Sequence, residues 1–299
     1  MELVLNAPAA DPSEYTITIN NGANWIGYPV QQSMDINEAL ADLTPASNDV
    51  IKSLNSLAMY SAGRWRGGLN TLEPGKGYVY TSKATGEKTF VYPSQSRSNA
   101  MLKKNIVPED NVWVPVRSEF RDNMSVVAKV SFADMTTMDE ETEVVAFVGD
   151  ECRGSAKLMY MEDTGEYVAF LLVYGQDGEL VSFKVYNDGE TMDAAETVEM
   201  RSDAVVGDLD APYALHSVGT MSLFPNPVSV GESVRMEMPA NVGLAGARVE
   251  VYNALGALLM NETLTNGDAE FRAMPVSGVY TVRVTDRKGN VHFGKLIVR

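Results

Sequence analysis

The 299-residue sequence is poor in the residues that build zinc sites and most nucleophilic active sites. It contains one cysteine and two histidines. A single cysteine excludes an internal disulfide, and no His-x-x-x-His or Cys-x-x-Cys spacing offers a zinc site of nitrogen and sulfur ligands. Glycine-rich phosphate loops are also missing, which excludes the common nucleotide-binding motifs. No apolar run approaches eighteen residues, so the sequence predicts no membrane-spanning helix.

Positive charge is scarce and unevenly distributed. The chain has 24 Lys and Arg against 40 Asp and Glu, a net charge of −16. Residues 111–207 hold 20 acidic and 7 basic residues, whereas residues 219–299 hold 7 and 8. The steps near residues 110 and 210 indicate three units. An acidic chain without a basic stripe repels phosphate backbones, so we expect no nucleic-acid partner.

Strand signals dominate all three units. Alternating apolar residues and Gly, Asp or Pro turns recur along the chain, and helical periodicity is confined to residues 33–43 and a short turn near 48–52. We therefore predict a mainly β fold of three β-rich modules in series. The first is β with short helices, and the second and third are Ig-like β-sandwiches. The predicted boundaries are 1–100, 111–203, a linker at 204–220, and 221–299.

Four short stretches near the C-terminus carry a family resemblance. Leu223–Val228, Val251–Gly256, Ser277–Val282 and Gly294–Arg299 occur in this order over about eighty residues. Together they resemble the landmarks of a type A sorting domain of the type IX secretion system of Bacteroidetes-type bacteria. The residues that we assign to the sorting signal are Phe224, Pro225, Asn226, Pro227, Gly278, Tyr280, Gly294, Lys295, Leu296, Val298 and Arg299.

The resemblance implies an export route and partners. The protein is expected to pass through the periplasm and to be secreted or held at the outer-membrane surface. The implied partners are the type IX translocon and a sortase-like peptidase, and in some members surface lipopolysaccharide is joined to the cargo after cleavage. We expect the cut between about Val205 and Ser222. Because Met1–Asn6 lacks the features of a signal peptide, we expect the native chain to extend upstream.

The first two modules resemble non-catalytic modules that accompany such sorting domains in surface proteins. For the first module the resemblance rests on stretches such as Asn24–Ile26 and Leu72–Tyr78, and for the second it rests on Val145–Gly154. The resemblance implies no catalytic role for either module. It does not identify a ligand.

The sequence offers no convincing catalytic group. Cys152 is the obvious nucleophile, but a cysteine nucleophile needs a histidine base. His216 lies in the expected linker and His292 in the terminal strand, and acidic neighbours raise a thiol pKa. A carboxylate pair for glycoside hydrolysis would need a deep cleft walled by aromatic residues, which a sandwich of this size seldom forms. We therefore expect no catalytic residues.

Acidic loop residues offer weak candidates for a calcium site. The segment 134–143 and the Asp-x-Asp at 208–210 place hard oxygen ligands on loops. Neither follows a strict calcium-loop spacing, so a solvated acidic surface is the alternative and no other cofactor is expected. The candidate ligands are Asp139, Glu141, Asp208 and Asp210.

Aromatic residues in the first module are the remaining ligand candidates. Trp65 lies between Arg64 and Arg66, with Tyr60 nearby in sequence. Sugar rings stack on exposed indole and phenol faces, and arginine can bond their hydroxyls, so a glycan or a host protein is a conceivable ligand. The alternative is that these rings fill a small core. We expect core packing for Trp25, and both alternatives stay open for Trp65.

The leading functional hypothesis is a non-catalytic secreted or cell-surface protein whose modules bind, adhere or act as spacers. One alternative is the C-terminal tail of a larger secreted protease or glycoside hydrolase, with catalysis upstream of Met1. A second alternative is a carbohydrate-binding module centred on the first unit.

Overall fold

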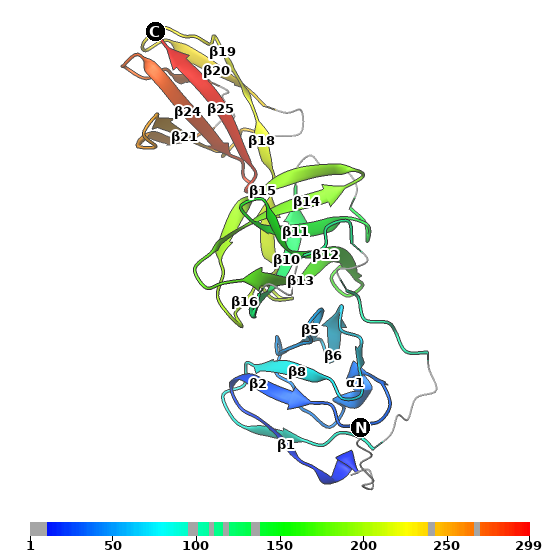
Figure 1. The fold of residues 1–299 in the computed structure, drawn as a ribbon. Coiled ribbons are helices and arrows are strands. Elements are labelled where there is room, and N and C mark those ends of the chain that lie inside the picture. The colour runs from blue at the N-terminus through cyan, green and yellow to red at the C-terminus, as the bar shows by residue number, and fades with distance from the viewer. Residues whose placement is uncertain are drawn as a thin grey trace, which may run out of the picture.

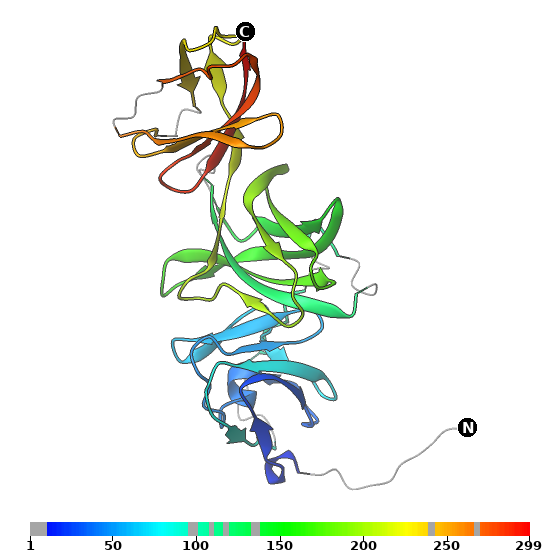
Figure 2. The same cartoon turned by 90° about the vertical axis from the view of Figure 1, so that its left-hand side faces the viewer.

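The computed structural model describes residues 11–94, 101–107, 111–115, 120–132, 138–238, 243–265 and 270–299. The fold is mainly β, as predicted, and strands make up almost all of the regular structure in these residues. Figures 1 and 2 show three modules in a row, with the C-terminus at the far end of the third. No helix in the described part of the chain is long and apolar enough to cross a membrane.

The first module is a five-stranded sheet with a helix and two short strand pairs on one face. Its elements are η1 (Pro12–Glu14), β1 (Ile17–Ile19), β2 (Gly22–Gly27), β3 (Met34–Asp35), α1 (Ile36–Ala39), β4 (Val50–Lys52), β5 (Leu57–Ser61), β6 (Arg64–Gly67), β7 (Thr71–Leu72), β8 (Gly77–Ser82) and β9 (Lys88–Phe90). The sheet has the order β2-β8-β4-β5-β6, and the pairs are β1–β9 and β3–β7. Apolar residues of all these strands and of α1 share one core.

The helical predictions for this module are only partly correct. α1 covers four residues because Asp35 caps it, accepting the Asn37 N–H at 2.8 Å. The turn predicted near residues 48–52 is wrong, because Val50 to Lys52 form the central strand β4 instead. All three β4 side chains are buried. A strand whose two faces are both covered shows no polar alternation, which explains the error.

The second module is one strongly curved sheet. Its strands are β10 (Asp122–Ser131), β11 (Glu143–Val148), β12 (Glu151–Met161), β13 (Glu166–Gly175), β14 (Leu180–Asn187), β15 (Glu190–Glu199), β16 (Val205–Val206) and β17 (Tyr213–His216). The order is β15-β14-β11-β12-β13-β10-β16, with β17 also paired to β10. A bridge between Ala194 and Ser217 brings the two ends of the sheet together. Its two halves therefore face each other across one apolar core.

The motif at residues 149–154 forms the turn and bulge that let β12 bend. Gly149 closes the β11–β12 hairpin with a φ of 59°, and the register then shifts so that Phe147 faces Cys152 and Ala146 faces Gly154. β12 pairs with β11 on both sides of this bulge, as far as Lys157, and with β13 from Leu158 onward. A bulge that increases local twist is a common device for closing a sheet. The sequence at residues 149–154 thus has a structural role in shaping this sheet.

The segment 204–220 is not a linker, which corrects the predicted boundaries. β16 and β17 both pair in parallel with β10, and β18 (Val218–Thr220) pairs in parallel with the last strand of the third module. Leu215 is fully buried in the core of the second module. The segment therefore belongs to both neighbouring modules and joins them without a free stretch.

The third module is a two-layer sandwich. Its strands are β19 (Ser222–Phe224), β20 (Ser233–Glu237), β21 (Arg248–Asn253), β22 (Leu258–Thr263), β23 (Glu270–Arg272), β24 (Gly278–Thr285) and β25 (Val291–Val298). One sheet has the order β18-β25-β24-β21-β22 and the other β19-β20-β23. Alternate apolar residues of both sheets meet in a core separate from those of the other two modules.

The first and second modules share a buried interface. Val50, Leu57 and Met59 of the first module pack with Val127 and Phe170 of the second. These side chains come from the face of the first sheet that is turned away from its own core. Burying apolar surface at such a contact stabilises the pair as one body.

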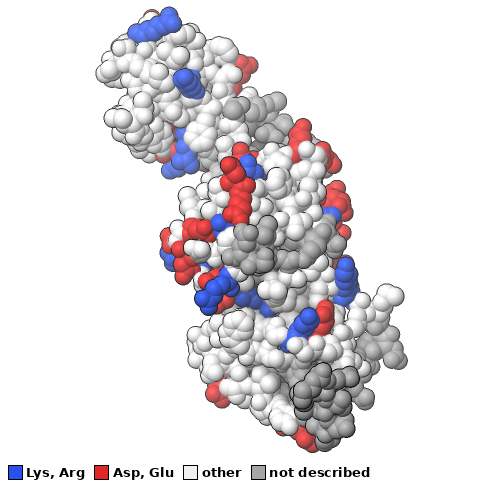
Figure 3. All heavy atoms as spheres, in the orientation of Figure 1, with Lys and Arg blue, Asp and Glu red and all other residues white. Residues whose placement is uncertain are grey.

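Polar contacts close the rim of this interface. Lys52 is 4% exposed, and its Nζ donates to the Asn123 Oδ1 and the Asp203 Oδ1, each at 2.7 Å. The Tyr174 hydroxyl donates to the Leu54 carbonyl oxygen at 2.7 Å. Because a buried ammonium group without partners would be costly, the pairing of Lys52 fixes how the modules meet. Away from the interface, acidic side chains gather on the surface of the second module (Figure 3).

We predict that Gly154→Ala destabilises the second module. A Cβ at this position would lie 2.3 Å from the carbonyl oxygen of Leu172, so the backbone of β13 would have to move. Overpacking of this kind costs about 1–3 kcal/mol. Gly86→Ala is the matched control, because a Cβ there meets nothing within 4 Å. Denaturant unfolding followed by circular dichroism should separate the two variants, and equal stabilities would contradict the bend described for β12.

Candidate functional site

Trp65, the centre of the predicted ligand site, is part of the core. Its side chain is 6% exposed, and its ring centroid lies 5.3 Å from that of Tyr60 and 5.7 Å from that of Tyr80, both edge-on. The position directly opposite Trp65 on β5 is Tyr60, on the core-facing side. The indole faces are therefore covered and cannot stack on a sugar, so the core alternative holds for Trp65.

The arginines beside Trp65 point to the other face of β6, because side chains alternate along a strand. Arg66 pairs with Asp163 of the second module, with Nη1 to Oδ1 at 2.6 Å. Arg64 is exposed. Arg64, Trp65 and Arg66 line one hollow beside the second module, but Tyr60 does not line it and the Trp65 ring is buried. Arg66 instead contributes to the contact between modules.

Trp25, unlike Trp65, lies on the surface, so the prediction that it fills the core is wrong. Its side chain is 83% exposed. It faces Val79 across the β2–β8 pair, and the next pair on the same face is Gly27 with Gly77. Glycines offer a large ring nothing to pack against, so the indole stays in solvent.

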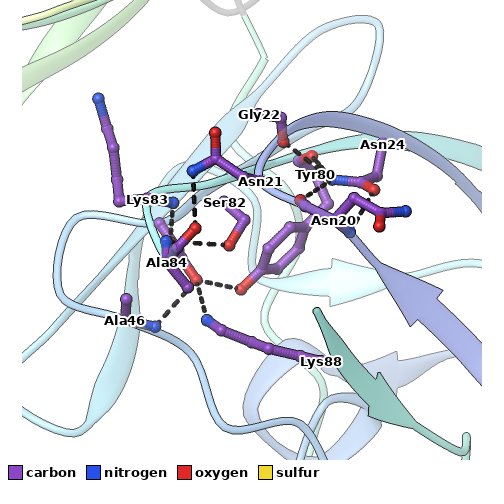
Figure 4. Close-up of polar contacts among 11 residues, drawn as sticks. Asn20, Asn21, Gly22, Asn24, Ala46, Tyr80, Ser82, Lys83, Ala84 and Lys88 are labelled. Atoms are coloured by element: carbon purple, nitrogen blue, oxygen red, sulfur yellow. Dashed lines mark hydrogen bonds and ion pairs between the residues drawn. The ribbon is translucent and has the colours of Figure 1, made fainter. Parts of the chain in front are cut away.

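Sequence analysis missed a buried carboxylate at the centre of the first module. Asp49 is fully buried, and its carboxylate accepts from the Tyr80 hydroxyl at 2.6 Å, the Lys83 N–H at 2.6 Å, the Ala46 N–H at 2.9 Å and the Lys88 ammonium at 2.9 Å. Figure 4 shows these partners converging from separate strands and loops. Burial, and then the hydrogen bond to Asp49, raise the pKa of Tyr80. All four donors come from the first module itself, so the Asp49 carboxylate links separate strands and loops of that module.

Cys152 is half-buried and poorly placed for nucleophilic chemistry. Burial raises the pKa of its thiol, and the nearby charges of Glu143 and Glu151 raise it further. Its Sγ lies 3.9 Å from the Gly154 carbonyl oxygen. His216, one of the two histidines, instead lies against Glu196, with Nδ1 to Oε1 at 2.6 Å.

The calcium candidates serve as turn caps and ion-pair partners. Asp139 accepts the N–H groups of residues 141 and 142, and Glu141 pairs with Lys157 at 2.5 Å. Asp208 accepts the N–H groups of residues 210 and 211, and Asp210 accepts from Asn48 at 2.9 Å. Residue 134 lies outside the described residues. No three metal-binding side chains converge in the ranges that the structure describes.

Three of the four stretches that resemble sorting landmarks, in contrast, meet at the last strand. The fourth, Val251–Gly256, lies on β21 and the turn after it, and β21 pairs with β24. The Asn226 side chain bridges the main chain of β25, donating from Nδ2 to the Lys295 carbonyl oxygen at 2.6 Å and accepting the Ile297 N–H at 2.9 Å. Val228 then continues the contact, donating its N–H to the Ile297 carbonyl oxygen and accepting the Arg299 N–H. The first landmark is thereby fastened to the last one, about seventy residues later.

The third landmark, Ser277–Val282, lies opposite the same strand. Gly278 faces Val298 and Tyr280 faces Leu296 across the β24–β25 pair. Tyr280 is 6% exposed, and its hydroxyl donates to the Val276 carbonyl oxygen at 2.7 Å. A Cβ at Gly294 would lie 3.1 Å from Leu223, so the small residue lets the opening strand approach. Phe224, Pro225, Pro227, Lys295 and Arg299 remain on the surface of this cluster.

We predict that Asn226→Ala lowers the melting temperature of the third module. The variant removes two hydrogen bonds to β25, each with a net stabilisation of about 0.5–1.5 kcal/mol. Asn261→Ala is the control, because Asn261 is an exposed asparagine on β22. Differential scanning calorimetry should show the loss for Asn226→Ala alone. An unchanged transition temperature in that variant would mean that the two Asn226 hydrogen bonds do not stabilise the module.

The chain matches no protein-family model and no curated protein. Among solved structures it is similar to the FN1–FN3 domains of chicken CNTN1, with 13% identity over 94% of this chain and 95% of that one and a TM-score of 0.21. It is also similar to the fibronectin(III)-like modules of Clostridium thermocellum CbhA, with 14% identity, 58% and 93% coverage and a TM-score of 0.20. Dimeric latent PorU from Porphyromonas gingivalis shows 15% identity, 84% and 30% coverage and a TM-score of 0.21. We draw no conclusion about ligand, partner or activity from likenesses this weak.

Proposed function

We propose that the chain is a non-catalytic protein exported by the type IX secretion system, with its third module as the sorting domain. The observation that carries the proposal is the clamp of Asn226 on β25, which joins the first and last landmarks in one cluster. A folded module with its own core can serve as a sorting signal that is removed without unfolding the rest of the protein. The translocon and the sortase-like peptidase are the partners that this function requires.

The two upstream modules are the cargo in this proposal. They share a buried apolar interface and the paired Lys52, so they form one rigid body. A rigid body without a catalytic constellation in its described residues suits binding, adhesion or spacing at the outer-membrane surface. Anchoring to lipopolysaccharide after cleavage is the surface-attached version of this function, and release into the medium is the secreted one.

Within this proposal we expect the cut to lie between the cores of the second and third modules. Leu215 is fully buried in the second module, and Met221 is 8% exposed in the core of the third. A cut before residue 215 would remove Leu215 and the end of β17 from the cargo, and a cut after residue 221 would leave Met221, a core residue of the third module, on the cargo. Only residues 217–220 lie between the two cores. β18 is extended and forms the edge of its sheet, which is the form in which peptidases bind substrates.

Export is tested by moving the third module. A periplasmic reporter with a signal peptide and residues 217–299 at its C-terminus should reach the surface or medium of a bacterium that has a type IX system. The same reporter without the module should stay in the periplasm, as should the full fusion in a translocon-deficient strain. Export that does not depend on the module would contradict the proposed function.

The cut is tested separately by mass spectrometry of the exported full-length cargo. We predict a new C-terminus within residues 217–220, because this position leaves β17 and Leu215 in the cargo. A C-terminus before residue 213 or after residue 221 would show that the module boundary is misplaced even if export itself succeeds.

A further inference from the structure

The first module exposes three large apolar side chains, and two of them line grooves beside one turn. Within residues 11–94 these are Trp25 at 83%, Leu54 at 72% and Tyr15 at 57% exposed. Tyr15 and Leu54 each line a groove, and both grooves are lined by Lys76 of the β7–β8 turn. Clustered apolar side chains on a surface mark an interaction site more often than scattered ones do.

Trp25 stands beside a flat strip of backbone between the grooves. Gly27 lies two residues along β2 and faces Gly77 of β8. A Cβ at Gly27 would meet nothing within 4 Å, and one at Gly77 would meet only the Ile26 carbonyl oxygen at 4.0 Å. Gly27 lines the groove of Tyr15, and Gly77 lines the groove of Leu54. The strip is therefore open to a flat ligand that stacks on the indole.

The two grooves have the size of short ligand segments and differ in character. The first, of about 400 Å³, is apolar and includes Tyr15 and Tyr28. The second, of about 430 Å³, mixes polar and apolar groups and includes Ser53, Asn55 and Lys104. Apolar walls with a few polar groups that fix orientation are typical of small-molecule and sugar sites.

One polar atom of the second groove lacks a donor. The Oδ1 of Asn55 is buried and accepts no hydrogen bond from any of the described residues. A buried acceptor left without a partner is costly, so a hydroxyl donor from a ligand would be favourable there. Asn55 lines the groove that adjoins Gly77.

The charge of the grooves favours an anionic ligand. Lys76 and Lys104 line them, and Glu73 is the single acidic residue among the lining side chains. The Glu73 carboxylate accepts from Asn105 at 3.4 Å. The chain as a whole has a charge of −16, but at physiological salt charges beyond about 8 Å are largely screened. The local lysines therefore dominate.

We propose that this surface, defined by Tyr15, Trp25, Leu54, Asn55 and Lys76, binds an acidic polysaccharide. A pyranose ring has an apolar C–H face that stacks on an indole and a rim of hydroxyls that supplies donors. Uronate carboxylates would pair with the lysines. A chain of such rings can follow the strip from one groove to the other. The surface lies on the first module, so the proposal is independent of the export route.

Calorimetric titration of the purified full-length protein tests the proposal, with hexagalacturonate as acidic probe and cellohexaose as neutral probe. We expect binding of hexagalacturonate that weakens with added salt. Trp25→Ala should weaken the binding on the order of tenfold or more, as loss of a central aromatic contact does. Lys76→Ala should reduce the salt dependence. Tyr160→Ala is the matched control, because Tyr160 is a 46% exposed aromatic residue on the second module, and it should bind like the unmodified protein.

Three results would overturn the proposal. They are no binding of hexagalacturonate, binding that survives Trp25→Ala in a variant with unchanged unfolding, and equal or tighter binding of cellohexaose. Size-exclusion chromatography with light scattering runs beside the titration. A dimer that Trp25→Ala dissociates would assign the surface to a second copy of the chain instead and would also overturn it.

Discussion

Burial of the first sheet on both faces is the constraint on which most of the structure depends. One face carries the module's own core, and the other meets the second module through Val50, Leu57 and Met59. The central strand β4 has no solvated face, so a polar group buried there or beside it needs partners. Asp49 finds four donors within its own module, and Lys52 finds its acceptors across the interface. The pairing of Lys52 thus contributes to the relative position of the two modules, together with the apolar contacts and the Arg66–Asp163 ion pair.

The same constraint limits what the sequence could predict. The β-rich class and the long apolar strands of the second module follow from alternation and turn residues, and the structure has them. The sequence places Trp25 wrongly and leaves Trp65 undecided, because alternation gives the parity of a strand but not which face is the core. Trp25 lies on the face that becomes the interface, at an edge strand that the second module leaves uncovered. That outcome depends on how the modules meet, and no local pattern encodes it.

Strands β15, β16 and β17 are hard to recognise in the sequence for a related reason. β15 is half-exposed and rich in Glu, Asp and Thr, so it lacks the apolar signal by which strands are recognised. β16 and β17 are short and pair in parallel with β10, more than seventy residues earlier. Gly, Asp and Pro at 207–212 resemble a linker, although they only connect these two strands. Long-range pairing determines the structure here.

The sorting landmarks were found by resemblance, and the structure supplies the physical reason for their spacing. Asn226 and the Lys295–Ile297 stretch are far apart in the sequence, and only folding brings them together. In the folded module the Asn226 side chain forms one hydrogen bond with Lys295 and one with Ile297. Tyr280 and Gly278 are brought to the same strand by the β24–β25 register. A receptor that recognises these residues together must recognise the folded sandwich, because no short peptide contains more than one of the clustered groups. In the proposed function the sorting signal is therefore a property of tertiary structure, and its exposed part is the rim formed by Phe224, Pro225, Pro227 and Lys295.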